Sequence, residues 1–275
     1  MLVIDTHVHF YDPFKTNDLP WPPKNNLILY KKYYPDDLLK ELDNKYTIKT
    51  ILIESSPRLK DNFVSLKIAN DNNSILGYIA NIDISKDHFC ESVNEFLVNS
   101  KFKGIRLRPS KINLKNNIEL LNFEFLQEKN INIDLLCNPE DFLIIEFLAK
   151  NFPKLNFIIN HLLNFTIYNL FDKDQLKSLK KLSKHNNIFI KVSSLPILLK
   201  SSKDLKKAYY NILYELINIF KVDNLVYGSN WPVIKTNSDY IQQFELLLNT
   251  YKLFDKKNSN KIFYNNAVEL YSLQD

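Results

Sequence analysis

The segment Ile4-Asp5-Thr6-His7-Val8-His9-Phe10 lies near the start of the chain and carries two histidines separated by one residue. It belongs to a short run that is rich in Leu, Val, Ile and Phe, Leu2–Phe10, and such a run is typical of a β-strand. Side chains on a strand point alternately to its two faces, so both imidazoles point to the same side. Two imidazoles placed in this way can hold a metal ion or polarise a carbonyl group. The segment therefore predicts a first strand whose end carries chemistry.

Short apolar runs recur along the chain, and each ends in polar residues. They predict eight strands, at Leu2–Phe10, Thr50–Ser55, Ile75–Ile82, Phe102–Arg108, Ile131–Cys137, Asn156–Leu162, Asn187–Ser193 and Asn224–Ser229. Near-continuous apolar strands are typical of a parallel sheet that is covered on both faces. The segments between them are amphipathic and predict helices, among them Pro35–Leu42, Ser85–Leu97, Pro139–Lys150, Asp204–Lys221 and Ser238–Leu253.

Eight strands that alternate with helices fit either an open doubly wound sheet or a closed barrel. The chain has only three glycines, Gly77, Gly104 and Gly228, and none forms the G-x-G-x-x-G turn of a dinucleotide-binding fold. We therefore predict an α/β protein, a single (β/α)8 TIM barrel, with residues 1–275 forming one domain. The long segment Tyr11–Tyr34 follows the first strand, and we expect this loop to lie over the barrel mouth.

The composition is that of an ordinary globular protein, with 45% hydrophobic residues, 24% charged residues and a net charge of +5. The lysines are dispersed, which favours solvated surfaces over a nucleic-acid-binding groove. No apolar run reaches the roughly 18 residues of a membrane span. The two cysteines are far apart, and no basic and apolar leader precedes the first strand. We expect a cytoplasmic protein that binds a small molecule, neither nucleic acid nor membrane, and the oligomeric state stays open.

Active groups in a TIM barrel come from the carboxyl ends of the strands. Three of the five histidines lie at such ends. The candidate site residues at the predicted strand ends are His7, His9, Glu54, Arg106, Arg108, His161, Lys191 and Asn230.

Each of the charged candidates has a functional and a structural interpretation. Arg106 and Arg108 can bind a substrate carboxylate or carbonyl, or form ion pairs in the barrel. Lys191 can polarise a carbonyl, or pair with a carboxylate such as Glu54 or Asp134. Glu54 is in turn either a base or an ion-pair partner.

Six segments, in order along the chain, resemble the amidohydrolase-2 family, and most closely its sugar-lactone and 2-pyrone-4,6-dicarboxylate lactonases. They are Ile4–Pro13, Leu19-Pro20-Trp21, Lys103-Gly104-Ile105-Arg106, Ile159-Asn160-His161-Leu162, Ile190-Lys191-Val192-Ser193 and Gly228-Ser229-Asn230-Trp231-Pro232. The last helix of that family is matched by Phe263–Tyr271. The resemblance implies a (β/α)8 barrel that hydrolyses a lactone or a related carbonyl substrate.

The resemblance also limits the cofactor. Some members of the family use a divalent metal ion and others use none. Decarboxylase relatives carry a metal-binding histidine after strand five, where this chain has Leu136-Cys137-Asn138, and the carboxylated lysine of two-metal relatives has no counterpart. We expect either no metal or one divalent ion, preferably zinc, held by His7, His9 and His161. Trp21 in the first loop is a candidate wall of the substrate site.

Asn230 departs from the family pattern Gly-Ser-Asp-Trp-Pro, in which the aspartate would be the base that activates water. An amide cannot take up that proton, and losing a general base typically costs about 10²–10⁴ in rate. The chain is then an enzyme whose base is elsewhere, at His161 or Glu54, a binding protein without catalysis, or a chain inactivated by substitution. Lactone hydrolysis by His7, His9, His161 and Asn230 is the leading hypothesis. The alternatives are a small-ligand-binding barrel and a metal-dependent decarboxylase.

Overall fold

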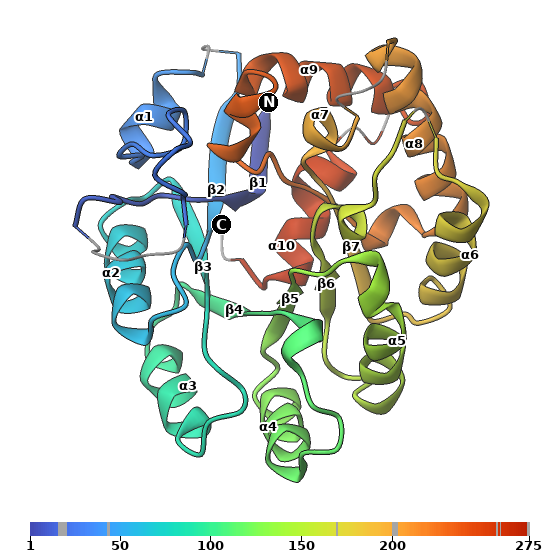
Figure 1. The fold of residues 1–275 in the computed structure, drawn as a ribbon. Helices are drawn as coiled ribbons and strands as arrows, with labels where there is room; N and C mark the ends of the chain where they lie inside the picture. The colour runs from blue at the N-terminus through green and yellow to red at the C-terminus, as the bar shows by residue number, and fades with distance from the viewer. Residues whose placement is uncertain are drawn as a thin grey trace.

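Eight parallel strands form the centre of this computed structural model, which describes residues 1–15, 21–42, 45–168, 170–199, 203–256, 258 and 260–273. They are β1 (Leu2–Val8), β2 (Thr47–Ile53), β3 (Ile75–Ala80), β4 (Phe102–Leu107), β5 (Asn132–Leu135), β6 (Phe157–Ile159), β7 (Ile188–Val192) and β8 (Leu225–Tyr227). Each strand pairs with the next in the chain. Helices surround the strands in a ring (Figure 1).

The ring of strands closes between β8 and β1, immediately beyond the end of β8. Asn230 donates a backbone hydrogen bond of 2.9 Å to the carbonyl of His7, and His9 donates one of 2.8 Å to the carbonyl of Trp231. Gly228 is required at this closure, because a Cβ there would lie 2.8 Å from the Cβ of His7. The predicted (β/α)8 barrel is therefore confirmed, and its closure places the two most distant motifs side by side.

The helices connect successive strands and cover the outer face of the barrel. They are α1 (Pro35–Leu39), α2 (Leu59–Asn70), α3 (Phe89–Leu97), α4 (Asn117–Glu128), α5 (Phe142–Asn151), α6 (Lys173–Leu182), α7 (Leu195–Leu198), α8 (Leu205–Ile219), α9 (Tyr240–Tyr251) and α10 (Asn266–Leu270). The predicted helix Ser85–Leu97 begins later than expected, at Phe89, because Ser85 bonds to Asp83 in a turn. Among the described residues, no helix is both long and apolar enough to cross a membrane.

The helix α10 closes one end of the barrel. Ala267, Leu270 and Tyr271 pack against apolar side chains inside the barrel, including Ile4 and Val226. The side chain of Asn132, at the start of β5, donates a 3.0 Å hydrogen bond to the carbonyl of Leu270. Helix α10 therefore lies at the amino ends of the strands, and the carboxyl ends remain open to the cavity.

The predicted strands are longer than those observed. Leu2–Phe10 ends at Val8 as a strand, and Asn156–Leu162 is reduced to β6, because the backbone turns left-handed at His161. Of the predicted loop Tyr11–Tyr34, residues 16–20 lie outside the described residues, and with them Leu19 and Pro20 of the second family segment.

Candidate active site

A cavity of about 700 Å³ opens at the carboxyl ends of the strands. It is lined by residues from several parts of the chain, and its polar lining includes both signs of charge. The sequence-predicted residues that line it are His9, Trp21, Glu54, Arg106, Arg108, His161 and Asn230. Active groups in barrels of this type lie at this end, so the cavity is the candidate active site.

His7 lies behind the wall of this cavity. Its ring is fully buried, with its centroid 5.0 Å from that of His9 and 4.5 Å from that of His161. Neither ring nitrogen has a hydrogen-bond partner among the described residues. Burial, followed by the nearby His161 and Lys191, holds the pKa of His7 well below its usual range. His7 is therefore a neutral imidazole at neutral pH.

The proton on the ring of His9 can be placed from its partner. Its Nδ1 lies 3.1 Å from the carbonyl oxygen of Ile53, and a carbonyl can only accept a hydrogen bond. Nδ1 therefore carries the proton, and Nε2 has a lone pair. Burial, together with the charge of Arg106, lowers the pKa of His9 to about 3. At neutral pH His9 can accept a hydrogen bond or bind a cation through Nε2, but it cannot donate from that atom.

His161 is presented by an unusual turn. The segment Asn160–Asn164 (η3) holds four consecutive residues in the left-handed region, with φ of 52° at His161. Each such residue costs about 1–2 kcal/mol unless its surroundings offset the strain. The side chain of Asn164 helps to stabilise this turn, because its Nδ2 donates a 2.9 Å hydrogen bond to the carbonyl of Cys137. Burial and the nearby Arg106 hold the pKa of His161 well below its usual range, so this imidazole is neutral as well.

Asn230 also has a left-handed backbone, with φ of 66°. Asparagine adopts this conformation more readily than most residues. Its side-chain Nδ2 donates a 2.6 Å hydrogen bond to the hydroxyl of Ser194, and the residue lines the cavity. With Nδ2 occupied in this way, Oδ1 remains as the acceptor of this side chain.

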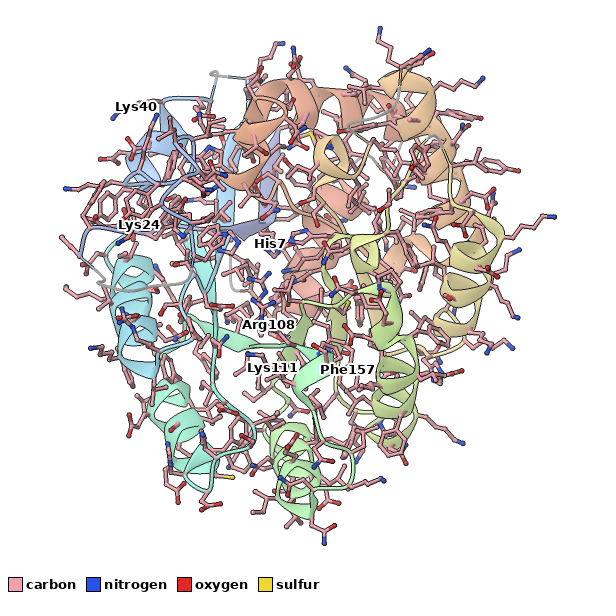
Figure 2. All side chains as sticks on the ribbon, in the orientation of Figure 1. His7, Lys24, Lys40, Arg108, Lys111 and Phe157 are labelled. Atoms are coloured by element: carbon pink, nitrogen blue, oxygen red, sulfur yellow. The ribbon has the colours of Figure 1, made fainter. Side chains whose placement is uncertain are left out.

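Cationic side chains line the cavity as well. Arg106 is 8% exposed, and its Nη1 lies 3.4 Å from Oε1 of Glu54. Burial lowers the pKa of Arg106 and the charge of Glu54 opposes that shift, so the guanidinium stays charged. Arg108 and Lys111 also line the cavity, and Figure 2 shows both over the middle of the barrel.

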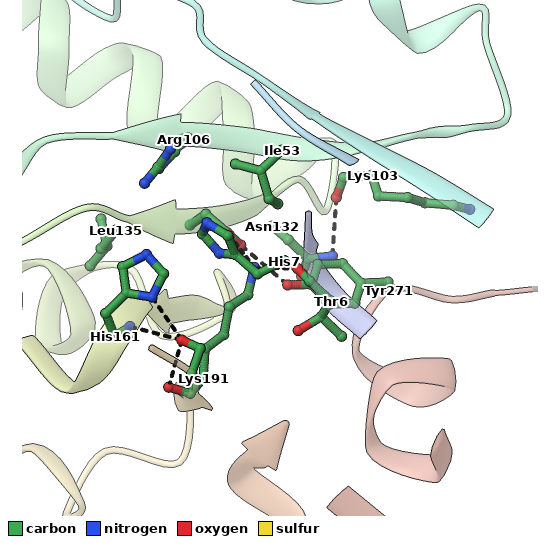
Figure 3. A network of polar contacts seen from close by, with 12 residues as sticks. Thr6, His7, Ile53, Lys103, Arg106, Asn132, Leu135, His161, Lys191 and Tyr271 are labelled. Carbon is green, nitrogen blue, oxygen red and sulfur yellow. Dashed lines mark hydrogen bonds and ion pairs between the residues drawn. The ribbon is translucent and has the colours of Figure 1, made fainter. Parts of the chain in front are cut away.

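Lys191 has the structural arrangement that the sequence left open. Its side chain and that of Asp134 are both 0% exposed and form an ion pair. Its Nζ also donates a 2.8 Å hydrogen bond to the carbonyl of Thr6. Lys191 lies beside His7 and His161 (Figure 3), but it is not among the described residues that line the cavity. Burial lowers its pKa and Asp134 opposes this.

Trp21 is placed against the histidines by the loop after β1. Its ring centroid lies 5.3 Å from that of His9 and 4.8 Å from that of Tyr11. Tyr11 in turn pairs with Tyr33 through backbone hydrogen bonds of 2.8 and 2.9 Å. The part of the loop that the structure describes thus contributes an aromatic wall to the cavity.

The three histidines are the candidate ligands of a resident metal ion. His7, His9 and His161 are neutral imidazoles, the form that binds a metal ion, but position 230 supplies an amide where a carboxylate would supply charge. No three His, Cys, Asp or Glu side chains among the described residues are grouped so that they could hold an ion. The amide at position 230 would hold a metal ion less tightly than a carboxylate, and the chemistry proposed below routes no step through a metal ion.

Sequence reasoning missed two contributors to this site. Lys111 lies in a short turn beyond β4, and its signal was the occurrence of three cations within Arg106–Lys111. Ser194 lies one residue past the predicted strand Asn187–Ser193. Its role depends on contacts with His161 and Asn230, which no sequence pattern reveals.

Comparison with known proteins supports the predicted resemblance. An L-fucono-1,5-lactonase from Burkholderia ambifaria is 22% identical over 236 residues, which cover 84% of this chain and 80% of the relative. A zinc-bound amidohydrolase from Burkholderia multivorans has a TM-score of 0.86 at 17% identity, with 100% of both chains covered.

A probable 2-pyrone-4,6-dicarboxylic acid hydrolase from Acinetobacter baumannii, with citric acid bound, has a TM-score of 0.77 at 18% identity. The match covers 99% of this chain and 100% of that one. At such identities the two structures establish the fold alone. The model of the family described as Amidohydrolase, however, matches residues 4–273. The chain therefore belongs to the amidohydrolase family.

Proposed function

We propose that this chain is a hydrolase that opens a small lactone, either a sugar-acid lactone or one that carries a carboxylate. The observation that carries the proposal is the arrangement of the cavity wall. A buried guanidinium, Arg106, and the acceptor groups of His161 and Asn230 line the same cavity. Hydrolysis of an ester carbonyl needs these two functions, a positive group for the oxygen and an acceptor for the proton of water.

The hydrogen-bonding of the imidazoles supports a particular division of labour. His9 has its proton on Nδ1 and presents a lone pair, so it is unsuited to polarise a carbonyl. Arg106 is charged and lines the cavity, so we assign to it the carbonyl oxygen and the negative charge that develops there. His7 has no access to the cavity and supports the two other imidazoles through ring contacts.

We assign the base to His161 and the orientation of water to Asn230. The oxygen of water attacks the ring carbonyl carbon, and Nε2 of His161 takes the proton that water loses. Oδ1 of Asn230 accepts the second hydrogen of that water and holds it in place. When the tetrahedral intermediate collapses, the ring C–O bond breaks, and the alkoxide leaving group receives the proton from His161. The product is an open-chain hydroxy acid.

Two further cations in the cavity wall, Arg108 and Lys111, support a substrate that carries negative charge. Arg108 and Lys111 line the cavity beyond Arg106, while Glu54 and Asp83 balance part of this charge. A lactone with a carboxylate remote from the reacting carbonyl would find a cation there, since arginine binds carboxylates through paired hydrogen bonds.

The test is a hydrolysis assay of the purified chain against sugar-acid lactones and pyrone carboxylates, followed by proton release at constant pH. His161→Gln should lower the rate by about 10²–10⁴, the usual contribution of a positioned base. His88 is exposed at the start of α3 and is not among the described residues that line the cavity, so His88→Gln is the matched control and should leave the rate unchanged. A rate no faster than buffer on every lactone, with binding still detected by calorimetry, would instead identify a binding protein.

A further inference from the structure

Two consecutive serines follow β7 and lie on either side of one nitrogen of His161. The hydroxyl oxygen of Ser193 is 2.8 Å from Nδ1, and that of Ser194 is 3.2 Å from the same atom. Both residues are buried, at 2% and 3% exposure, and neither is among the described residues that line the cavity. Their effect on the reaction must therefore pass through His161 and Asn230.

The hydroxyl of Ser193 has three neighbours but only one proton. The backbone N–H of His161 can only donate, and it points to this oxygen at 3.3 Å. The carbonyl of Lys191 can only accept, and it lies 3.3 Å away, so we assign the hydroxyl proton to it. The remaining 2.8 Å contact, to Nδ1, is then a hydrogen bond from Nδ1–H to the serine oxygen. A neutral imidazole with its proton on Nδ1 has its lone pair on Nε2.

Ser194 has a different partner on its other side. Its oxygen accepts the 2.6 Å hydrogen bond from Nδ2 of Asn230. Its backbone is left-handed, with φ of 58°, as are those of His161 and Asn230 at 52° and 66°. Three strand ends are thus held in uncommon backbone conformations so that three side chains meet. Such strain persists where the surrounding structure stabilises it, and it is concentrated at functional sites.

We propose that Ser193 is a positioning residue that holds His161 with its proton on Nδ1 and so directs the Nε2 lone pair at the cavity. Ser194 has a separate role: it orients the amide of Asn230, so that Oδ1 is turned away from the serine. Of the two adjacent serines, Ser193 therefore positions the base, His161, and Ser194 positions Asn230, which orients water. The kinetic consequence rests on the proposed lactone hydrolysis, but the tautomer of His161 does not.

The first experiment reads the tautomer directly. Full-length chain labelled with ¹⁵N-histidine is examined by long-range ¹H–¹⁵N spectroscopy, and the His161 signals are identified by their loss in His161→Gln. We expect a protonated Nδ1 and an unprotonated Nε2. Ser193→Ala should move population to the other tautomer, whereas Ser194→Ala should leave the His161 pattern in place. A wild-type spectrum with the proton on Nε2 overturns the proposal, and so does an unchanged spectrum of a folded Ser193→Ala variant.

The second experiment measures kinetics on whichever lactone is turned over. Ser193→Ala should lower kcat by about five- to tenfold, the equivalent of one lost hydrogen bond, with KM little changed. Ser193→Thr keeps the hydroxyl and should restore both the rate and the tautomer. If Ser193→Ala does not fold, the wild-type spectrum alone decides. If no lactone is opened, the spectra still decide the tautomer, so failure of the function is distinguished from failure of this proposal.

Discussion

Replacing Lys191 by methionine should destabilise the fold far more than an ordinary substitution, and should do so without a direct effect on substrate binding. Lys191 and Asp134 are both 0% exposed, and the pair lies inside the barrel. Without the ammonium group, the carboxylate keeps the hydroxyl of Tyr271, at 3.2 Å, but loses its countercharge. The carbonyl of Thr6 also loses a donor that lies 2.8 Å away.

The size of the effect follows from this burial. Breaking a buried ion pair by removing one partner typically costs about 3–5 kcal/mol, because a buried charge is left uncompensated. For a chain of this size that corresponds to a fall in Tm of roughly 5–9 °C. Methionine has a volume and shape similar to those of the lysine stem, so a cavity contributes little. The double variant Lys191→Met with Asp134→Leu removes both charges and should recover most of the lost stability.

The assay is urea unfolding of the single and double variants, followed by circular dichroism, with the slope of the transition checked for two-state behaviour. A loss below about 1 kcal/mol in Lys191→Met would refute the argument, since a surface-like value is incompatible with a fully buried pair. A double variant as unstable as the single one would refute it as well. A stable single variant with a raised KM would instead assign Lys191 to the substrate.

Three further predictions concern the site and its pH dependence. Asn230→Asp adds a carboxylate beside the base that we assign to His161, so initial rates at pH 7 should change by less than the roughly 10²-fold that a general base contributes, and a larger rise would assign the base to position 230. Burial raises the pKa of Asp5 to about 6, so the folded state favours its protonated form, and this contribution is present below pH 4 and lost as the pH rises through 6. Asp5→Asn should therefore gain up to about 3 kcal/mol over the wild type at pH 8, with the gain disappearing near pH 3, in urea unfolding at both pH values. Zinc should be substoichiometric in the purified wild type by elemental analysis and higher in Asn230→Asp, and a full equivalent in the wild type would contradict the donor-set argument.

Much of the architecture was accessible from local pattern. Strand-length apolar runs alternating with amphipathic segments predict β/α units, and the absence of a glycine-rich turn favours a barrel. The barrel then predicts that strand ends converge, and the structure does bring His9, His161 and Asn230 to one cavity. The strand ends themselves were less accurate, because Asn160–Asn164 leaves the strand through left-handed residues that side-chain pattern does not indicate.

The roles of individual side chains depended on contacts that no local pattern contains. From the sequence, Lys191 could face either the substrate or a carboxylate. The structure shows that its side chain, from β7, pairs with that of Asp134, from β5. Likewise, the proton on His9 is located by the carbonyl of Ile53, which belongs to a different strand.

The sequence by itself determined the class of fold, the family and the set of residues at the strand ends, because periodicity, spacing and motif order are properties of the chain. Tertiary structure decided which of these residues reach the cavity and which atom of each is available there. The physical reason is that an imidazole, an ammonium or an amide acquires its protonation and its direction from the partner that faces it. Those partners come from segments far away in the chain, such as Ser194 for Asn230.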